Sequence, residues 1–293
     1  MRTISRRFFP FLVVAFVVLA AFGGLRADPA CALCEKWNTS HEPFQIYGNT
    51  YYVGTAGLSS ILIISDAGHV LIDGDLAESA PQIAANIRSL GFHLEHVKLI
   101  LNSHAHFDHA GGIAQLQRLT DAKAWASPSS ARGLRAGNLG PEDPQYGAIR
   151  GFPPVEDIGV LADNQTLRLG PIAVTAHFTP GHTPGGTTWT WNSCEGDKCR
   201  HMVYADSLTA VSAPGFHFNR PSVVAEFEKS FAVLKSLPCD ILLSSHPEAS
   251  DFWSRLERRD RGDGNALVDT AACRRYADAA QAGLEKRLAS ERK

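Results

Sequence analysis

The sequence Ser103-His104-Ala105-His106-Phe107-Asp108-His109 follows the largely apolar run at 97–102 and decides the fold. Three histidines and one aspartate fall within residues 104–109. A strand that ends in such a loop can direct His104 and His106 toward one metal ion, and Asp108 and His109 toward a second. Neutral imidazole and carboxylate groups are ligands that Zn²⁺ prefers. The stretch therefore predicts a metal site at the end of a strand.

Two later histidines stand where further ligands are needed. His182 lies in the loop 179–186, in which two prolines and three glycines fix the backbone and let it approach a ligand. His246 follows the apolar run 241–243 and precedes Pro247, which favours a turn. Either histidine alone would suit a structural role, but a site for two metals requires ligands from later strands. We expect most of the other histidines on the surface or beside the ligands: His41, His69, His93, His96, His177, His201 and His217.

Composition limits the class of protein. The chain has 293 residues, 44% of them apolar, which suits one large domain or two small ones. Its formal net charge is −2 and it has no run of basic residues, which argues against a nucleic-acid binder. Nothing in the pattern demands more than a monomer.

The N-terminus has the pattern of a secretory signal peptide. Arg2, Arg6 and Arg7 precede the apolar run 8–22, and small residues follow up to Ala27. A retained membrane anchor is the alternative, but the run is short for a span and contains Pro10. We expect a signal peptide at 1–27, a mature domain at 28–293 with no membrane segment, and export to the periplasm.

All six cysteines lie beyond residue 28, and an even number in an exported chain suggests disulfides. Cys194 and Cys199 flank a turn-forming tetrapeptide and suit a hairpin staple. Cys239 and Cys273 could join the strand before His246 to the C-terminal helix. The motif Cys31-Ala32-Leu33-Cys34 fits a local disulfide, a redox pair or a metal clip, and the sequence leaves these alternatives open.

The order of predicted elements indicates the architecture. Short β-type runs at 44–47, 51–53, 60–64 and 70–73 are separated by turns and predict an antiparallel meander. Later strands are expected at 97–101, 123–126, 167–169, 172–178, 187–191, 202–204 and 241–243. Helices are expected at 77–90, 113–119, 221–237 and 269–292, and a long loop at 137–154. Strands and helices thus occur in the same kind of order twice along the chain, with candidate ligands at strand ends in both halves. This order predicts an α+β fold, a four-layer αββα sandwich with the site between its sheets.

These motifs resemble the metallo-β-lactamase superfamily, and within it the third subclass of class B β-lactamases. The motif at 104–109 is typical of the superfamily, which also includes thioesterases, lactonases and nucleases. More specific to the subclass are the segments 46–50, 180–183, 188–191, 204–210, 240–247 and 273–276. The resemblance also implies the disulfides Cys194–Cys199 and Cys239–Cys273. Some relatives pair an early cysteine with one near position 56, where this chain has Ala56.

The resemblance implies a site with two Zn²⁺ ions. It assigns one ion to His104, His106 and His182, and the other to Asp108, His109 and His246. It further implies that the substrate is held by Ser207, Thr209 and Gln145, with Ser207 and Thr209 on its carboxylate.

The implied reaction is hydrolysis of β-lactam antibiotics, namely penicillins, cephalosporins and carbapenems, conferring resistance. A water bound to zinc ionises near pH 7 and can attack the lactam carbonyl, with Asp108 as the catalytic residue that orients it. The main alternative is a thioesterase or lactonase on the same scaffold, which would use Asp206 to bridge its metals. A secreted metal-binding protein without hydrolytic activity is a third possibility.

Overall fold

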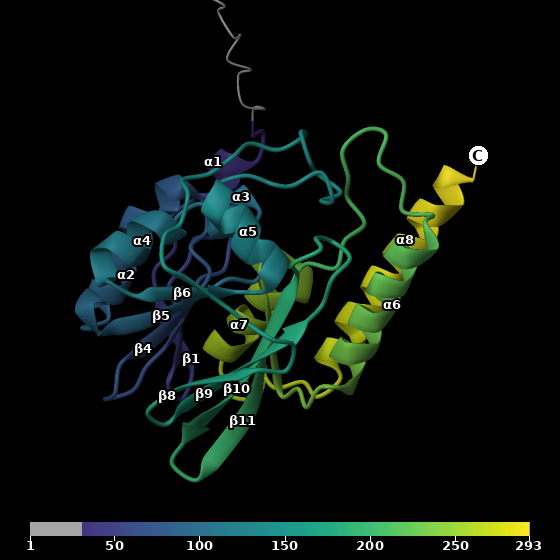
Figure 1. The fold of residues 1–293 in the computed structure, drawn as a ribbon. Coiled ribbons are helices and arrows are strands. Elements are labelled where there is room, and N and C mark those ends of the chain that lie inside the picture. The colour runs from purple at the N-terminus through teal and green to yellow at the C-terminus, as the bar shows by residue number, and fades with distance from the viewer. Residues whose placement is uncertain (1–30, 293) are drawn as a thin grey trace, which may run out of the picture.

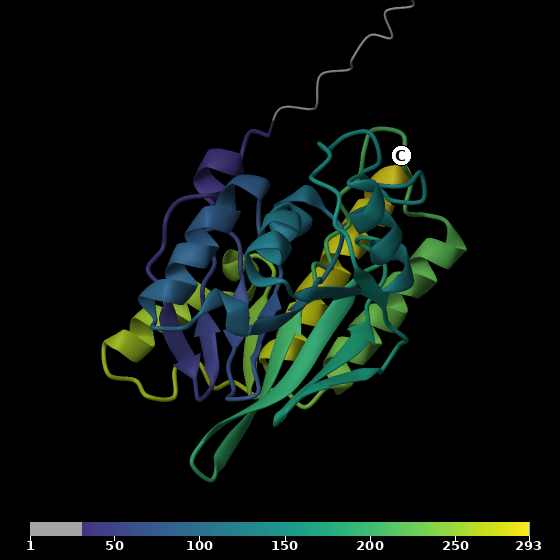
Figure 2. The same cartoon turned by 60° about the vertical axis from the view of Figure 1, so that its left-hand side comes forward.

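The computed structural model describes residues 31–292, so the signal peptide expected at 1–27 lies outside the described residues. Two sheets lie face to face (Figures 1 and 2). The first has the order β1-β2-β3-β4-β5-β6-β7. Its strands are β1 (Phe44–Tyr47), β2 (Thr50–Tyr52), β3 (Ile61–Ile63), β4 (His69–Ile72), β5 (Val97–Leu101), β6 (Lys123–Ala126) and β7 (Ile158–Val160).

The first sheet changes from antiparallel to parallel at β4. Strands β1 to β4 pair antiparallel and confirm the predicted meander. Strands β4 to β7 pair parallel, with the crossovers made by helices. The carboxyl ends of β4 and β5 therefore meet at one edge of the sheet, which is where the metal-loop sequence begins.

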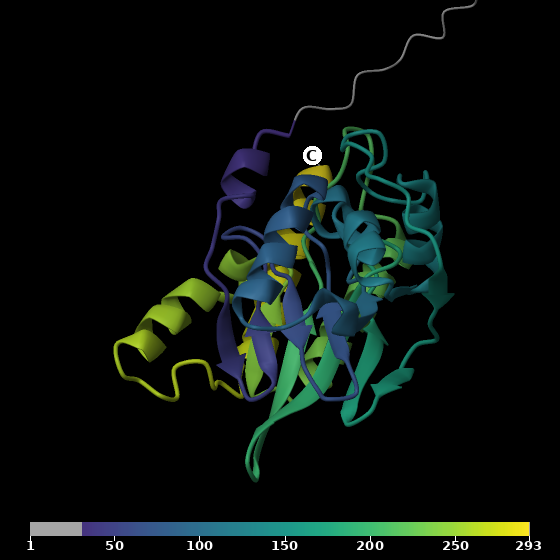
Figure 3. The same ribbon diagram turned by 90° about the vertical axis from the view of Figure 1, so that its left-hand side faces the viewer.

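The second sheet has the order β12-β11-β10-β9-β8. It is antiparallel except for the parallel pair β11 and β12. Strands β10 and β11 form a hairpin that extends away from the rest of the molecule (Figure 3). The strands are β8 (Thr166–Leu169), β9 (Ile172–Phe178), β10 (Thr187–Glu195), β11 (Lys198–Ala205) and β12 (Ile241–Ser244).

Three apolar layers separate four layers of structure and confirm the αββα sandwich. Alternate residues of β3 face opposite sides, so Leu62 packs under the helices while Ile61 and Ile63 pack against the second sheet. Trp189 and Tyr204 fill the layer between the sheets, and Phe227 lies in the layer under the C-terminal helices. The helices over the first sheet are α2 (Ala80–Ser89), α4 (Ile113–Thr120) and α5 (Pro128–Ala136); those over the second are α6 (Pro221–Ser236) and α8 (Ala272–Glu291).

The predicted helices are confirmed with small shifts at their ends. The segment predicted at 77–90 consists of the 3₁₀ turn η1 (Ala77–Ser79) and α2. Sequence analysis missed α5, β7 and α7 (Phe252–Asp260), while the loop predicted at 137–154 contains no helix or strand. The remaining short elements are α1 (Cys34–Trp37), η2 (Leu94–His96), α3 (Phe107–Ala110) and η3 (Pro247–Ser250).

The structure pairs all six cysteines. The disulfides Cys194–Cys199 and Cys239–Cys273 join the expected partners, and Cys31–Cys34 forms a local disulfide, one of the three alternatives that the sequence left open. Within residues 31–292, every helix is too short or too polar to cross a bilayer.

Candidate metal centre

A buried carboxylate at the end of β4 fixes the metal loop. Asp73 is fully buried, and its carboxylate accepts hydrogen bonds from the Ser103 amide at 2.7 Å, the Ser103 hydroxyl at 2.6 Å and the Tyr204 hydroxyl at 2.8 Å. The Gly74 amide donates to the His109 carbonyl at 2.9 Å. These bonds tie the loop after β5 to the neighbouring strand, so the backbone that carries the histidines of the loop is held in place.

The first group of ligand atoms comes from both sheets. His104 and His106 follow β5, whereas His182 lies in the loop between β9 and β10. One ligand atom from each lies within 4.8 Å of those of the others. The Nε2 atom of His104 is buried without a hydrogen-bond partner in the described chain. An orphaned buried nitrogen between two further imidazoles fits a metal ion, which would satisfy it.

Asp206 lies behind His104. Its carboxylate is 2.6 Å from the Nδ1 atom of His104, and both side chains are fully buried. Burial, with the nearby charge of Asp73, raises the pKa of Asp206 well above its usual range. The 2.6 Å contact requires a proton between the two groups, and when Nδ1 donates it to Asp206, Nε2 of His104 is left for a metal ion. This is the arrangement in which an outer carboxylate orients a metal-binding histidine.

The other two imidazoles of this group are held in the same manner. The Nε2 atom of His106 lies 3.2 Å from both carboxylate oxygens of Asp143. The Nδ1 atom of His182 donates to the Thr209 carbonyl at 2.8 Å. Each ring thus has one nitrogen bonded to an oxygen of the protein, and its other nitrogen is the candidate metal ligand; for His106 this is Nδ1, which has the Gln145 side-chain nitrogen 3.4 Å away. No local sequence pattern predicts this role for Asp143.

The second group surrounds Asp108. Its Oδ2 atom lies 3.3 Å from Nε2 of His109 and 3.4 Å from Nε2 of His246. His109 is buried, and neither of its ring nitrogens has a hydrogen-bond partner within residues 31–292. Ligand atoms of His104, Asp108 and His109 also lie within 4.8 Å of one another, so the two groups are adjacent. The structure thus brings together all six residues that the sequence analysis assigned to metal.

The protonation states suit metal binding. Burial lowers the pKa of His104 well below its usual value and that of His182 to about 3, and the neighbouring imidazoles add to the effect. Burial acts to raise the pKa of Asp108, but His109 and His246 outweigh it and hold that pKa well below the usual range. Neutral imidazole and ionised carboxylate are the forms that coordinate metals.

A cleft of about 440 Å³ opens over these residues. His106, Asp108, His182 and His246 line it, and so do Gln145, Ser207 and Thr209, the residues predicted to contact the substrate. The Ser207 hydroxyl is 2.9 Å from that of Ser245. Asp206 is fully buried behind the imidazoles and does not line the cleft, whereas its neighbour Ser207 does.

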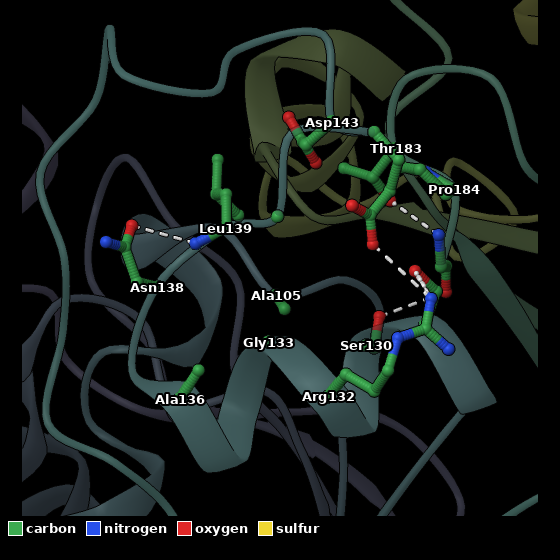
Figure 4. A pocket seen from close by; sticks show the side chains of 14 residues that line it. Ala105, Ser130, Arg132, Gly133, Ala136, Asn138, Leu139, Asp143, Thr183 and Pro184 are labelled. Carbon is green, nitrogen blue, oxygen red and sulfur yellow. Dashed lines mark hydrogen bonds and ion pairs between the residues drawn. The ribbon is translucent and has the colours of Figure 1, made fainter.

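Helix α5 supports the loop that carries His182. The hydroxyl groups of Ser127 and Ser130 donate to the Gly185 carbonyl at 2.6 and 3.1 Å. Figure 4 shows a neighbouring cavity of about 240 Å³ over α5, with Asp143 and Thr183 on its far side. Asp143 therefore lies between this cavity and the metal centre, and its carboxylate bonds to His106 and to the Gln145 backbone amide.

Comparisons with known proteins agree with this geometry. The family model of the metallo-β-lactamase superfamily matches residues 54–195. The solved structure of the Rm3 metallo-β-lactamase is 54% identical with a TM-score of 0.88, and the match covers 90% of this chain and 100% of that one. MEM-A1, a subclass B3 metallo-β-lactamase isolated from a soil metagenome library, is 51% identical with a TM-score of 0.85, covering 87% and 98%.

A more distant similarity points to another activity. A hydroxyacylglutathione hydrolase of Jannaschia sp. (strain CCS1) is 26% identical over 194 residues. That match covers 66% of this chain and 63% of the relative, so the chain spans less than two thirds of the relative's length.

Proposed function

The chain belongs to the metallo-β-lactamase superfamily, and on that premise we propose that it hydrolyses the amide bond of β-lactam antibiotics. The observation that carries the proposal is the placement of Asp206 and Ser207. The Asp206 carboxylate contacts Nδ1 of His104 and does not line the cleft, whereas Ser207 does. The similarity to the Rm3 metallo-β-lactamase over that protein's whole length supports the same activity.

We assign the metal ligands as two sets of three. One zinc ion would be held by His104, His106 and His182, and the other by Asp108, His109 and His246. The orphaned nitrogens of His104 and His109 support this assignment, because each is buried and otherwise unsatisfied in the described chain. When bound, zinc supplies positive charge that polarises the lactam carbonyl and makes a water molecule nucleophilic near pH 7.

The residues of the chain then orient the reactants. The ionised carboxylate of Asp108 orients the attacking water and accepts its proton as the water oxygen bonds to the carbonyl carbon; that proton passes to the lactam nitrogen when the C–N bond breaks. The hydroxyl of Ser207 can donate to the substrate carboxylate when Ser245 donates to Ser207. Nδ1 of His182 lies 2.8 Å from the Thr209 carbonyl and 3.0 Å from the Thr209 hydroxyl, so when Nδ1 donates to Thr209 the hydroxyl keeps its own proton to donate to the substrate. No protein side chain needs to attack the substrate, so no acyl-enzyme forms.

Gln145 extends the contacts to the opposite wall of the cleft. Its side-chain nitrogen lies 3.4 Å from Nδ1 of His106, and its backbone amide donates to Asp143 at 2.8 Å. The same carboxylate that orients His106 thus positions the loop that carries Gln145. We propose that the Gln145 amide contacts the substrate beside the first metal set.

We further propose that the protein is exported to the periplasm and acts there as a monomer. The three disulfides support an oxidising compartment. The competing function is thioester hydrolysis, which the similarity to the hydroxyacylglutathione hydrolase favours. That activity would have Asp206 bridge two metals, whereas here its carboxylate is bonded to Nδ1 of His104.

The test is hydrolysis of a carbapenem and a chromogenic cephalosporin by the purified protein, with and without a chelator. We expect turnover that the chelator abolishes and added zinc restores. Asp108→Ala should abolish turnover in a folded protein, while His177→Ala, on the outer face of β9, serves as the matched control and should leave it unchanged. A folded, zinc-loaded protein that hydrolyses thioesters but no β-lactam would refute the proposal in favour of its rival.

A further inference from the structure

The motif Cys31-Ala32-Leu33-Cys34 has no part in the metal centre, yet it lies at its entrance. Cys31, Ala32 and Leu33 line the same cleft as His182 and His246. In Figure 1, α1 lies at the same end of the molecule as the long loop at 137–154 and the loop after β11. A segment far from the ligands in sequence therefore forms one wall over them.

One end of this segment is anchored to the body of the protein. The Trp37 carbonyl accepts hydrogen bonds from the Thr55 hydroxyl at 2.7 Å and the Gly57 amide at 3.2 Å. The Trp37 ring lies 5.2 Å from the His246 ring and 6.4 Å from the Phe107 ring, centroid to centroid. The C-terminal end of α1 is thus fixed directly beside the second group of proposed ligands.

The other end depends on the disulfide. The backbone hydrogen bond of Leu33 is local, from the Trp37 amide to the Leu33 carbonyl at 2.8 Å. A helix of four residues is far too short to be stable alone. The Cys31–Cys34 disulfide closes the turn, and both half-cystines pack partly buried against the core under the first sheet. This packing leaves the Leu33 side chain outside the core.

Leu33 is an exposed apolar side chain over a polar floor. It is 49% exposed, and Val211 on the loop after β11 is 51% exposed and lines the same cleft. Ile149 lines it from the loop at 137–154. Large apolar side chains left in water around a cleft indicate a binding surface. A ligand that fits has an apolar part for these walls and an anionic part for Ser207, Thr209 and the metal centre.

We propose that Leu33 is a specificity-determining residue that selects β-lactams with an apolar acyl side chain, and that the Cys31–Cys34 disulfide is the brace that holds it over the cleft. The identity of the substrate rests on the proposed function, whereas the apolar wall and its brace rest on the described contacts. Within the described residues, the hydrogen bond of Leu33 goes to Trp37 and not to any of the six assigned ligands, so we expect Leu33 to act on substrate affinity and not on the chemical step.

The test compares two penicillins that differ only in the acyl group, one with a phenylacetyl side chain and one with a free amine. Leu33→Ala should raise KM for the phenylacetyl substrate about tenfold, the low end of the effect of one methylene group in an apolar pocket, because Leu33 is half-exposed. KM for the free amine and kcat for both should stay near the wild-type values. Zinc content and thermal unfolding confirm that each variant is folded and loaded.

The brace is tested by opening disulfides of similar loop length. Cys31→Ser with Cys34→Ser should reproduce the Leu33→Ala effect, because the turn that positions Leu33 loses its closure. The matched control is Cys194→Ser with Cys199→Ser, which opens the hairpin of β10 and β11 at the end of the molecule away from the cleft. The control should leave the ratio of the two KM values unchanged. Equal ratios in all three proteins and the wild type would overturn the proposal.

A second readout does not depend on hydrolysis. Anilinonaphthalene sulfonate is an aromatic anion whose fluorescence rises in an apolar environment, and it should bind the wild type and the hairpin control more tightly than the two altered-wall variants. If the wild type hydrolyses neither penicillin but the probe distinguishes the variants, the proposed function fails while the apolar wall stands. If the probe binds all four proteins equally, the wall itself is refuted.

Discussion

The variant Asp206→Asn tests whether Asp206 orients His104 or is itself a metal ligand. The change keeps the size of a side chain that is fully buried and 2.6 Å from Nδ1 of His104. A hydrogen bond to a charged group contributes about 1.5–3 kcal/mol and one between neutral groups about 0.5–1.5 kcal/mol. The loss of about 1–2 kcal/mol should weaken zinc affinity by roughly 5- to 30-fold, in the range found when outer partners of metal ligands are changed.

The assay is a competition titration with a chromophoric chelator, which gives both the number of zinc ions bound and their dissociation constants. We expect Asp206→Asn to bind as many ions as the wild type, with the weaker affinity in the set that contains His104. Asp240→Asn is the matched control, because Asp240 pairs with His201 at 3.0 Å on the surface and should leave zinc binding unchanged.

Two results would refute this reasoning. Complete loss of one zinc equivalent in Asp206→Asn would mean that Asp206 is itself a ligand, as the thioesterase alternative requires. An affinity equal to that of the wild type would mean that its short contact with His104 does not orient the ring.

Four further outcomes follow from the structure. Opening Cys239–Cys273, whose partners are 34 residues apart, should lower the free energy of unfolding by about 4 kcal/mol, and opening Cys194–Cys199 by about 2 kcal/mol, as chemical denaturation would measure. Tyr204→Phe should cost about 1–3 kcal/mol in the same assay, because it leaves the buried Asp73 carboxylate without one of its donors. Burial raises the pKa of Asp75 to about 7, so the folded chain holds that proton more tightly than the unfolded chain. The free energy of unfolding of the zinc-free protein should therefore fall as pH rises from about 4 through 7. Urea titrations at each pH should show a fall up to roughly 4 kcal/mol larger than in Asp75→Asn. Asp143→Ala should weaken zinc binding at least tenfold, because His106 loses the carboxylate 3.2 Å from its Nε2, while Glu142→Ala on the exposed neighbour should not, in the same chelator competition.

The repeating parts of the fold could be predicted from the sequence because their patterns are local. The meander before residue 73 and the long helices α6 and α8 have strong apolar periodicity, and the structure has them at the predicted places. Helix α5 was missed because only three of its residues are buried, although Ser127 before Pro128 is a recognisable helix start. Strand β7 has three residues, too few for any periodicity.

The candidate site could be predicted only where its residues are dense in the sequence. The cluster at 104–109 alone predicts a metal site, and His182 and His246 become candidate ligands because that cluster is present. Asp143 belongs to a loop without periodicity, and its contact with His106 spans 37 residues. The role of the Cys31–Cys34 turn likewise depends on which face of the sandwich it packs against. Such contacts arise from tertiary packing, which no local pattern encodes.

The proposed ligands are shared between two halves that the ribosome makes at different times. His104 to His109 belong to the N-terminal sheet, while His182 and His246 come from segments joined to the second. A nascent chain that ends before residue 182 can offer the metals only part of each set, and the last ligand emerges when five sixths of the polypeptide is made. Tight binding of both proposed metals therefore requires that the two halves have docked, so zinc retention distinguishes a finished molecule from a truncated or misassembled one.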